Sequence, residues 1–208
     1  MKLTSKRALE ILNSSKGMGE DNNWIKHSIC VGNMAAILAR KLKLDVDYAK
    51  TLGYIHDIGK RFDWNKSHTL SGYEYILKLG YGEEFASVCL THSYLNNDIN
   101  CVAGGIPNSN SDKYEFKKEY IKNHEYTIYE KIINLADLMC TYKINTIEQR
   151  LQDLNTRKGV HENTKYHKEE TYKLKKYFAD LLGFDLYNLF PEIENDSTSL
   201  MKTSSKSH

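Results

Sequence analysis

Apolar side chains recur every three or four residues along most of this chain, which predicts amphipathic helices. The clearest case runs from Trp24 to Leu44, where Ile25, Ile29, Met34 and Leu38 fall at helical spacing. No segment alternates strictly between apolar and polar residues for long, so the sequence predicts no significant sheet. We therefore expect an all-α fold, with further helices over residues 3–12, 45–58, 68–79, 83–92, 112–123, 127–142, 145–158 and 163–182.

Polar residues and glycines mark where several of these helices begin and end. Asp45 is placed to cap the helix that follows it, and Gly59 is interpreted as the stop of that helix. Two pairs have the spacing of a capping box, in which side chain and backbone bond reciprocally. They are Asp112 with Glu115, and Asn145 with Glu148.

The length of 208 residues suits a single globular domain built as a helical bundle. We predict that residues 1–194 form the domain, including a C-terminal helical extension in which residues 184–193 pack back on the body. Residues 195–208 are rich in Ser, Thr and Lys and are predicted to be a disordered tail. Residues 95–110 form a connection long enough to act as a lid.

Composition narrows the class of protein. Hydrophobic residues make up 40% of the chain, charged residues make up 27%, and the net charge is only +2, which gives no signal for nucleic acid or a membrane surface. No apolar run reaches about 18 residues, and residues 1–15 lack the apolar core of a signal peptide. The cysteines form no CxxC pair, which favours buried, reduced thiols and a cytoplasmic location. They are Cys30, Cys89, Cys101 and Cys140.

Histidine or aspartate side chains stand in apolar surroundings at three places along the chain. His56 and Asp57 end an apolar helix, His27 shares a helix face with apolar residues, and Asp137 lies in a strongly apolar helix. A buried polar group without a partner costs several kcal/mol, and a metal ion can satisfy several such groups at once. The alternatives are a hydrogen-bonded core histidine at His27 and a buried hydrogen bond or salt bridge at Asp137.

The pattern of His27, His56 with Asp57, and Asp137 resembles the HD superfamily of metal-dependent phosphohydrolases. The string from His56 to Lys60 reads His-Asp-Ile-Gly-Lys and looks like the HDIG form of that motif. The resemblance runs from about residue 24 to residue 142. His68 and His92 lie where binuclear members of the superfamily have extra ligands. The alternative for both is a polar residue at a helix end.

This resemblance implies a set of roles. His27, His56, Asp57 and Asp137 would hold one metal ion, and Asp57 would bridge to a second ion held by His68 and His92. The cofactor would be a divalent transition metal (Fe, Mn, Co, Ni or Zn), as one or two ions per chain. Asp57 and Lys60 are the candidate catalytic residues, and Lys60 and Arg61 are candidates to contact a substrate phosphate. A solvated surface lysine is the alternative for Lys60.

The resemblance also implies a function. We expect a phosphomonoesterase or phosphodiesterase that acts, through metal-activated water, on a nucleotide or another small phosphorylated molecule. Two alternatives stay open: an HD-fold di-iron oxygenase and a non-catalytic nucleotide-binding module. The remaining histidines stand in polar stretches and are predicted to lie at the surface. They are His124, His161, His167 and His208.

Overall fold

The computed structural model describes residues 2–19, 22–62, 67–111 and 113–193. Within these ranges the chain forms helices and no strands, and a lone antiparallel bridge joins Cys140 to Ile144. The predicted all-α fold is therefore confirmed. The predicted tail and its boundary with the domain lie outside the described residues and stay a prediction.

The helices follow the predicted order along the chain. Their bounds are α1 (Ser5–Asn13), α2 (Asn23–Lys41), α3 (Val46–Ile55), the 3₁₀ turn η1 (Ile58–Arg61), α4 (His68–Lys78), α5 (Glu83–Thr91), α6 (Tyr114–Asn123), α7 (Ile128–Asp137), α8 (Ile147–Lys158), α9 (Thr164–Leu182) and η2 (Leu186–Leu189). Most helix ends differ from the predicted ones by a few residues, because helix ends fray and the apolar spacing does not determine the terminal residue.

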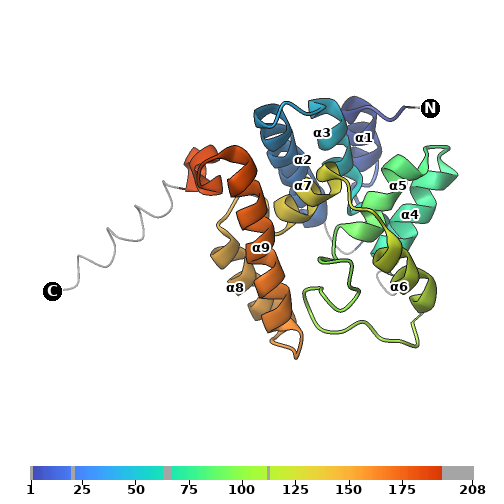
Figure 1. The fold of residues 1–208 in the computed structure, drawn as a ribbon. Coiled ribbons are helices and arrows are strands. Elements are labelled where there is room, and N and C mark those ends of the chain that lie inside the picture. The colour runs from blue at the N-terminus through green and yellow to red at the C-terminus, as the bar shows by residue number, and fades with distance from the viewer. Residues whose placement is uncertain (1, 20–21, 63–66, 112, 194–208) are drawn as a thin grey trace.

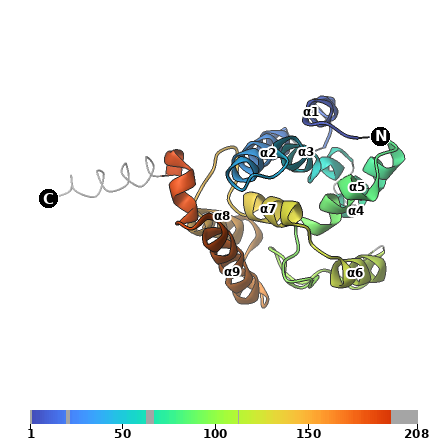
Figure 2. The ribbon, with the colours of Figure 1, turned by 45° about the horizontal axis from the view of Figure 1, so that its top comes forward.

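The bundle is arranged around α7, which packs against α2, α3, α5 and α9. Helices α1, α2 and α3 pack together on one side of α7, and α4 packs on α5 (Figures 1 and 2). Helices α8 and α9 lie together on another side of the molecule in both views. The chain therefore brings the ends of α3, α5 and α7 and the start of α4 toward the middle of the bundle.

Among the described helices, side chains cap the starts of α1, α3, α7 and α8. The Asp45 carboxylate accepts a hydrogen bond from the Tyr48 amide at 3.0 Å, as predicted. Thr127 and Glu130 form a capping box at the start of α7. The capping box predicted for Asn145 is wrong by one residue: Thr146 caps α8 with Gln149. The Asn145 amide instead bonds carbonyls of the preceding turn, among them those of residues 139 and 143.

Two other predicted helix ends are also corrected. Gly59 does not stop α3, which ends at Ile55; it lies inside η1 instead. Its small size matters for packing, as described below. The N-cap of α6 is Lys113 in a left-handed conformation, and α6 begins at Tyr114, two residues after the predicted start. Asp112 itself lies outside the described residues.

The main core is continuous across the bundle and includes the C-terminal segment. Leu186, Phe190 and Ile193 are buried, so residues 184–193 pack back on the body as predicted. Cys89, Cys101 and Cys140 are buried, whereas Cys30 is half-buried, and all four thiols are free. Residues 95–110 contain no helix and include Asn96 and Asn97 with positive φ. No described helix combines the length and apolar character needed to cross a membrane.

An ion pair between half-buried His124 and buried Glu130 links the end of α6 to the start of α7. His124 Nε2 lies 2.7 Å from Glu130 Oε1, and this bond raises the pKa of His124 above its ordinary value of 6.5. Burial alone would raise the pKa of Glu130, but the bonds from His124 and Thr127 outweigh it and lower that pKa. The contribution of His124 to folding stability is thus complete below about pH 6.5, and that of Glu130 is complete above about pH 4.5.

We expect His124→Ala to destabilise the protein more at about pH 6 than at about pH 9. At the higher pH the imidazole of the folded wild type has lost its proton, so the variant has less to lose. Thermal unfolding of metal-free protein at both pH values measures the difference. An equal loss of melting temperature at both values would show that the pair contributes no charge-dependent stability.

Candidate metal centre

Six predicted side chains converge where six structural elements meet. His27 comes from the second turn of α2, His56 is the C-cap of α3, and Asp57 directly precedes η1. His68 is the first residue of α4, His92 is the C-cap of α5, and Asp137 is the last residue of α7. Except for His27, each lies at a helix terminus, where a side chain can turn inward without breaking a helix.

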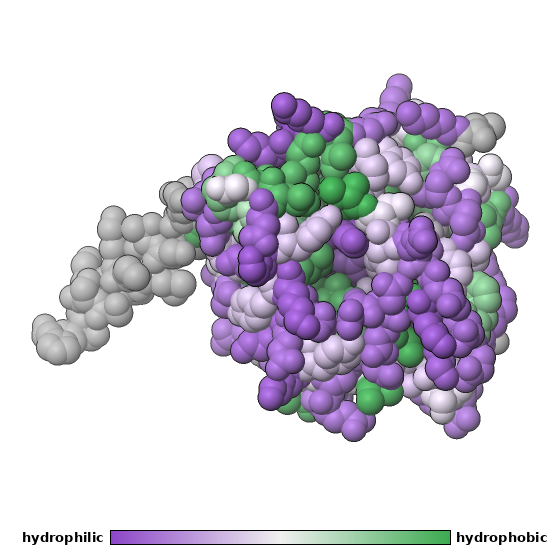
Figure 3. Space-filling view, in the orientation of Figure 1, coloured by the Kyte–Doolittle hydropathy of each residue, from purple (hydrophilic) through white to green (hydrophobic). Residues whose placement is uncertain are grey.

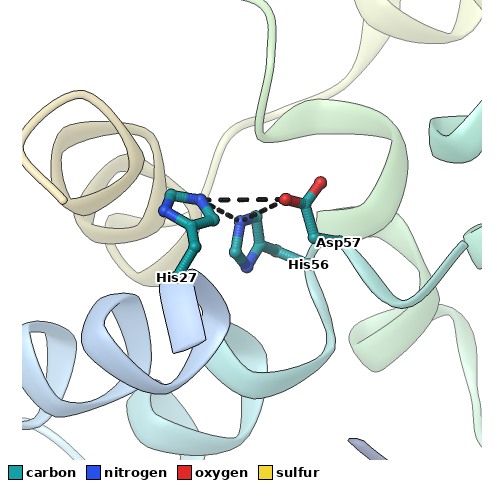
Figure 4. Close-up of side chains that lie close together, drawn as sticks. All are labelled: His27, His56 and Asp57. Atoms are coloured by element: carbon teal, nitrogen blue, oxygen red, sulfur yellow. Dashed lines mark hydrogen bonds and ion pairs between the residues drawn. The ribbon is translucent and has the colours of Figure 1, made fainter. Parts of the chain in front are cut away.

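One group of ligand atoms surrounds Asp57 Oδ2. His56 Nε2 lies 3.5 Å and His27 Nε2 lies 3.7 Å from this oxygen, and the two nitrogens are 3.3 Å apart. Figure 4 shows the two imidazoles and the carboxylate pointing toward one another. Asp137 Oδ1 lies 2.9 Å from His27 Nε2 and so adds a fourth donor beside this group.

A second group surrounds the other oxygen of the same carboxylate. His68 Nε2 and His92 Nε2 each lie 3.4 Å from Asp57 Oδ1. This oxygen is buried and has no hydrogen-bond partner among the described residues. The carboxylate of Asp57 is therefore shared, with one oxygen facing each pair of histidines.

Hydrogen bonds fix the orientation of two of the imidazoles. His56 Nδ1 lies 2.8 Å from the Gly53 carbonyl oxygen, and His92 Nδ1 lies 3.1 Å from the carbonyl oxygens of Val88 and Cys89. A carbonyl oxygen can only accept a hydrogen bond, so Nδ1 carries the ring proton and Nε2 presents a lone pair to the centre. This arrangement is typical of histidines that bind metals.

The charges at the centre also suit a cation. Burial lowers the pKa of His56 to about 3, so its imidazole is neutral at physiological pH. Burial alone would raise the pKa of Asp57, but the Lys60 ammonium and the imidazoles outweigh it and hold that pKa well below the usual range. Asp57 is therefore an anion beside the neutral imidazole of His56, which is the protonation state that metal ligands need.

These residues fit a divalent transition metal. Ligand atoms about 2.1 Å from one ion and separated by roughly 90–110° lie about 3.0–3.4 Å apart, close to the spacings in both groups. A mixed set of imidazoles and carboxylates is typical of such ions. An ion beside Asp57 Oδ1 would also satisfy a buried oxygen that the protein leaves unpaired.

The two predicted phosphate contacts lie differently. The Lys60 ammonium forms an ion pair with Asp57 Oδ2, so it lies at the edge of the centre. Arg61 points elsewhere: its Nη1 donates to the Tyr75 hydroxyl at 2.5 Å, and its guanidinium lies over the Tyr75 ring. The position of Lys60 suits contact with a substrate, whereas Arg61 is held away from Asp57.

The structure adds neighbours that sequence reasoning missed. Asn134, buried on α7, donates to the His92 carbonyl at 2.9 Å and so holds the end of α5. Arg150 of α8 donates to the Asp137 carbonyl at 3.4 Å. Asn134 is a polar residue within an apolar helix, and this was the available signal. The contact of Arg150 depends on the turn between α7 and α8, which has no sequence signal.

Among the histidines predicted to lie at the surface, the prediction for His167 is wrong. It lies on α9 and is only 5% exposed, and burial lowers its pKa to about 4. It lies on the buried face of α9. Because its neighbours in the sequence are mostly charged, the apolar spacing of that face is weak and does not predict burial there. His161 is exposed as predicted, His124 is half-buried beside Glu130, and His208 lies outside the described residues.

Gly59 allows η1 to touch the start of α4. A Cβ atom at Gly59 would lie 1.9 Å from the His68 carbonyl oxygen and 2.6 Å from the Gly72 amide nitrogen. Both are backbone atoms and cannot move aside alone. We therefore expect Gly59→Ala to destabilise the fold by about 1–3 kcal/mol and to displace His68 from Asp57.

Denaturant unfolding and metal analysis of the Gly59→Ala variant test this prediction. Gly72→Ala is the matched control, because the atoms nearest its added Cβ lie 3.1 and 3.2 Å away and the substitution should cost less. Wild-type stability in the Gly59→Ala variant would contradict the packing role.

The sequence model for the HD domain matches residues 24–141, which is more than half of the chain. This span begins at the first turn of α2 and ends just after α7. It contains all six converging residues, whereas α8 and α9 lie beyond it.

Curated relatives include two bacterial enzymes called Ribonuclease Y. The one from Protochlamydia amoebophila (strain UWE25) is 31% identical over 109 residues, which cover 48% of this chain and 21% of that protein. The one from Fervidobacterium nodosum (strain ATCC 35602 / DSM 5306 / Rt17-B1) is 39% identical over 72 residues, which cover 34% of this chain and 14% of that protein. The chain thus matches only about a fifth or less of these relatives.

Among solved structures, the HD domain of the L. monocytogenes phosphodiesterase PgpH aligns over 84% of this chain and 94% of that chain, with 14% identity and a TM-score of 0.45. The family assignment depends instead on the sequence match, which covers residues 24–141 and includes the histidines and aspartates described above. From this match we conclude that the chain belongs to the HD domain family.

Proposed function

We propose that this protein is a metal-dependent phosphohydrolase that cleaves a phosphomonoester or phosphodiester of a nucleotide or another small phosphorylated molecule. One observation carries the proposal: the buried Asp57 carboxylate is shared between two pairs of histidines, with Oδ1 left unpaired. Relatives named Ribonuclease Y support phosphate-ester chemistry, although they match over part of their length.

Each residue of the centre has a proposed task. His27, His56, Asp57 and Asp137 hold one ion, and His68 and His92 join Asp57 in holding a second. A divalent ion there supplies Lewis acidity, which lowers the pKa of water and polarises a phosphoryl oxygen. The bonds from the Nδ1 atoms of His56 and His92 to backbone carbonyls keep the ligand nitrogens aimed inward.

Lys60 is proposed to bind the substrate phosphate. Its ammonium already lies beside Asp57, and a phosphate oxygen at the centre would attract it more strongly than solvent does. We expect Lys60→Ala to lower kcat/KM by about a hundredfold while the metal content stays unchanged. Lys78→Ala, at an exposed lysine of α4, is the control. Unchanged kcat/KM in the Lys60→Ala variant would make Lys60 an ordinary surface lysine.

The experiment that tests the function compares two reactions of the same preparation. Release of p-nitrophenol from p-nitrophenyl phosphate and its bis ester, and of phosphate from a nucleotide panel, is measured without oxygen in the presence of Mn²⁺, Co²⁺ or Ni²⁺. We expect hydrolysis of at least one ester under these conditions. Oxygen consumption by iron-loaded protein without hydrolysis would favour the oxygenase, and nucleotide binding without either reaction would favour the binding module.

A further inference from the structure

A cavity lies beside α7, away from the six side chains of the metal centre. It has a volume of about 400 Å³ and opens between α7, α9 and the turn that follows α5. Figure 3 shows the molecule hollowed near the centre of this face. None of the six residues of the centre is among its described lining, and α9 lies outside the span matched by the family. The size is within the range of small-molecule sites, about 300–1,000 Å³.

Asn134 lines this cavity and is only 2% exposed. Its Nδ2 lies 3.0, 2.9 and 3.2 Å from the carbonyl oxygens of Thr91, His92 and Tyr94. Three acceptors around one atom require that atom to be the NH₂ group, so the orientation of the amide is fixed. The other end, Oδ1, is buried and has no protein partner among the described residues.

An unpaired buried amide oxygen costs about 1–3 kcal/mol. The Nδ2 side of Asn134 faces protein carbonyls and the residue lines the cavity, so we expect a donor for Oδ1 to approach from the cavity. A ligand that presents an N–H group there would supply the missing hydrogen bond. Asn134 would then connect the ligand to the backbone of His92.

The walls and rim of the cavity define the rest of the ligand. Tyr126, Tyr177 and Leu174 supply ring and aliphatic surfaces, which suit a flat apolar face. Lys131 Nζ lies 5.2 Å from the centre of the Tyr177 ring. Lys173 also lines the cavity and pairs with Glu170 at 2.7 Å. Two ammonium groups against one carboxylate leave the rim positive, which favours an anion.

We propose that this cavity binds a small planar anion with N–H donors, of the nucleoside monophosphate class. The base would lie against the tyrosines with an N–H group directed at Asn134, and the phosphate would lie near Lys131 and Lys173. This site is separate from the metal centre, and its occupancy does not depend on the proposed hydrolysis.

Calorimetric titration of the metal-free 208-residue chain tests the proposal. The probes are AMP, GMP, CMP and UMP, with inorganic phosphate as the reference anion. We expect saturable binding of at least one nucleotide, and a loss of about tenfold or more in affinity in the Lys173→Glu variant. Lys176→Glu, on the same helix but paired with Asp180 outside the cavity, is the matched control and should bind normally.

A second variant guards against an indirect effect of charge. Tyr177 is 38% exposed, so Tyr177→Ala should fold, and it should also weaken nucleotide binding. The proposal is overturned if no nucleotide binds, if phosphate binds as well as the nucleotides, or if Lys173→Glu and Tyr177→Ala bind like the wild type. It is equally overturned if binding is lost in the Asp57→Ala variant and kept in both cavity variants.

Discussion

Asp57→Ala is expected to abolish hydrolysis, by about a thousandfold or more, and to remove most of the bound metal. Both groups of ligand atoms share the Asp57 carboxylate, so one substitution removes an oxygen from each. An ion contributes several kcal/mol of transition-state stabilisation, and each 1.36 kcal/mol is about tenfold in rate. Elemental analysis and initial rates of the purified variant measure the two losses together.

The Asp57→Ala protein should remain folded. The lowered pKa of Asp57 means that the folded protein stabilises its carboxylate, so we expect the metal-free variant to lose some stability. It should still fold, because the Lys60 ammonium is partly exposed and solvent can hydrate it once its partner is removed. Circular dichroism and thermal unfolding of metal-free wild type and variant provide the control. Normal metal content and normal turnover in the variant would reduce Asp57 to a structural residue and remove the basis of the proposed function.

The double variant His68→Ala/His92→Ala is expected to lose one of two metal equivalents. These histidines face Asp57 Oδ1, whereas His27 and His56 face Oδ2, so the first group keeps its donors. We expect hydrolysis to fall by about a hundredfold or more, because a two-metal site acts on both the attacking and the leaving oxygen. Metal content by elemental analysis distinguishes this result from simple inactivation.

His161→Ala is the matched control for the double variant, because His161 is exposed and its ring bonds the Lys158 carbonyl. It should keep both metal equivalents and full activity. Full retention of metal in the double variant, with a raised KM, would contradict the second ion. His68 and His92 would then contact the substrate phosphate beside a single ion.

The helices were predictable because their information is local. The spacing of apolar residues in α2 and α7 reflects which side of each helix is buried, and that period is visible in the sequence. Helix ends were less predictable, because neighbouring polar residues compete for the cap. At α8, Asn145 and Thr146 both suit the position, and only the turn before them decides that Asn145 bonds carbonyls instead.

The candidate centre was predictable in its members but not in its surroundings. His56 with Asp57, and the aspartate within α7, are recognisable because charged or polar groups inside apolar helices need partners. The division of the Asp57 oxygens between two pairs of histidines depends on how η1 packs on α4 through Gly59, which is a tertiary contact. The burial of His167 and the contact between Arg150 and Asp137 depend likewise on where α8 and α9 pack.

The central claim is that metal held around Asp57 makes this protein a hydrolase. The most direct test is a titration of chelator-treated protein with Mn²⁺ in the absence of oxygen, with bound metal and ester hydrolysis followed in the same samples. We expect hydrolysis to appear only as metal binds and to saturate with the bound ion. Hydrolysis that is independent of added metal, or tight metal binding at Asp57 without hydrolysis of any ester tested, would contradict it.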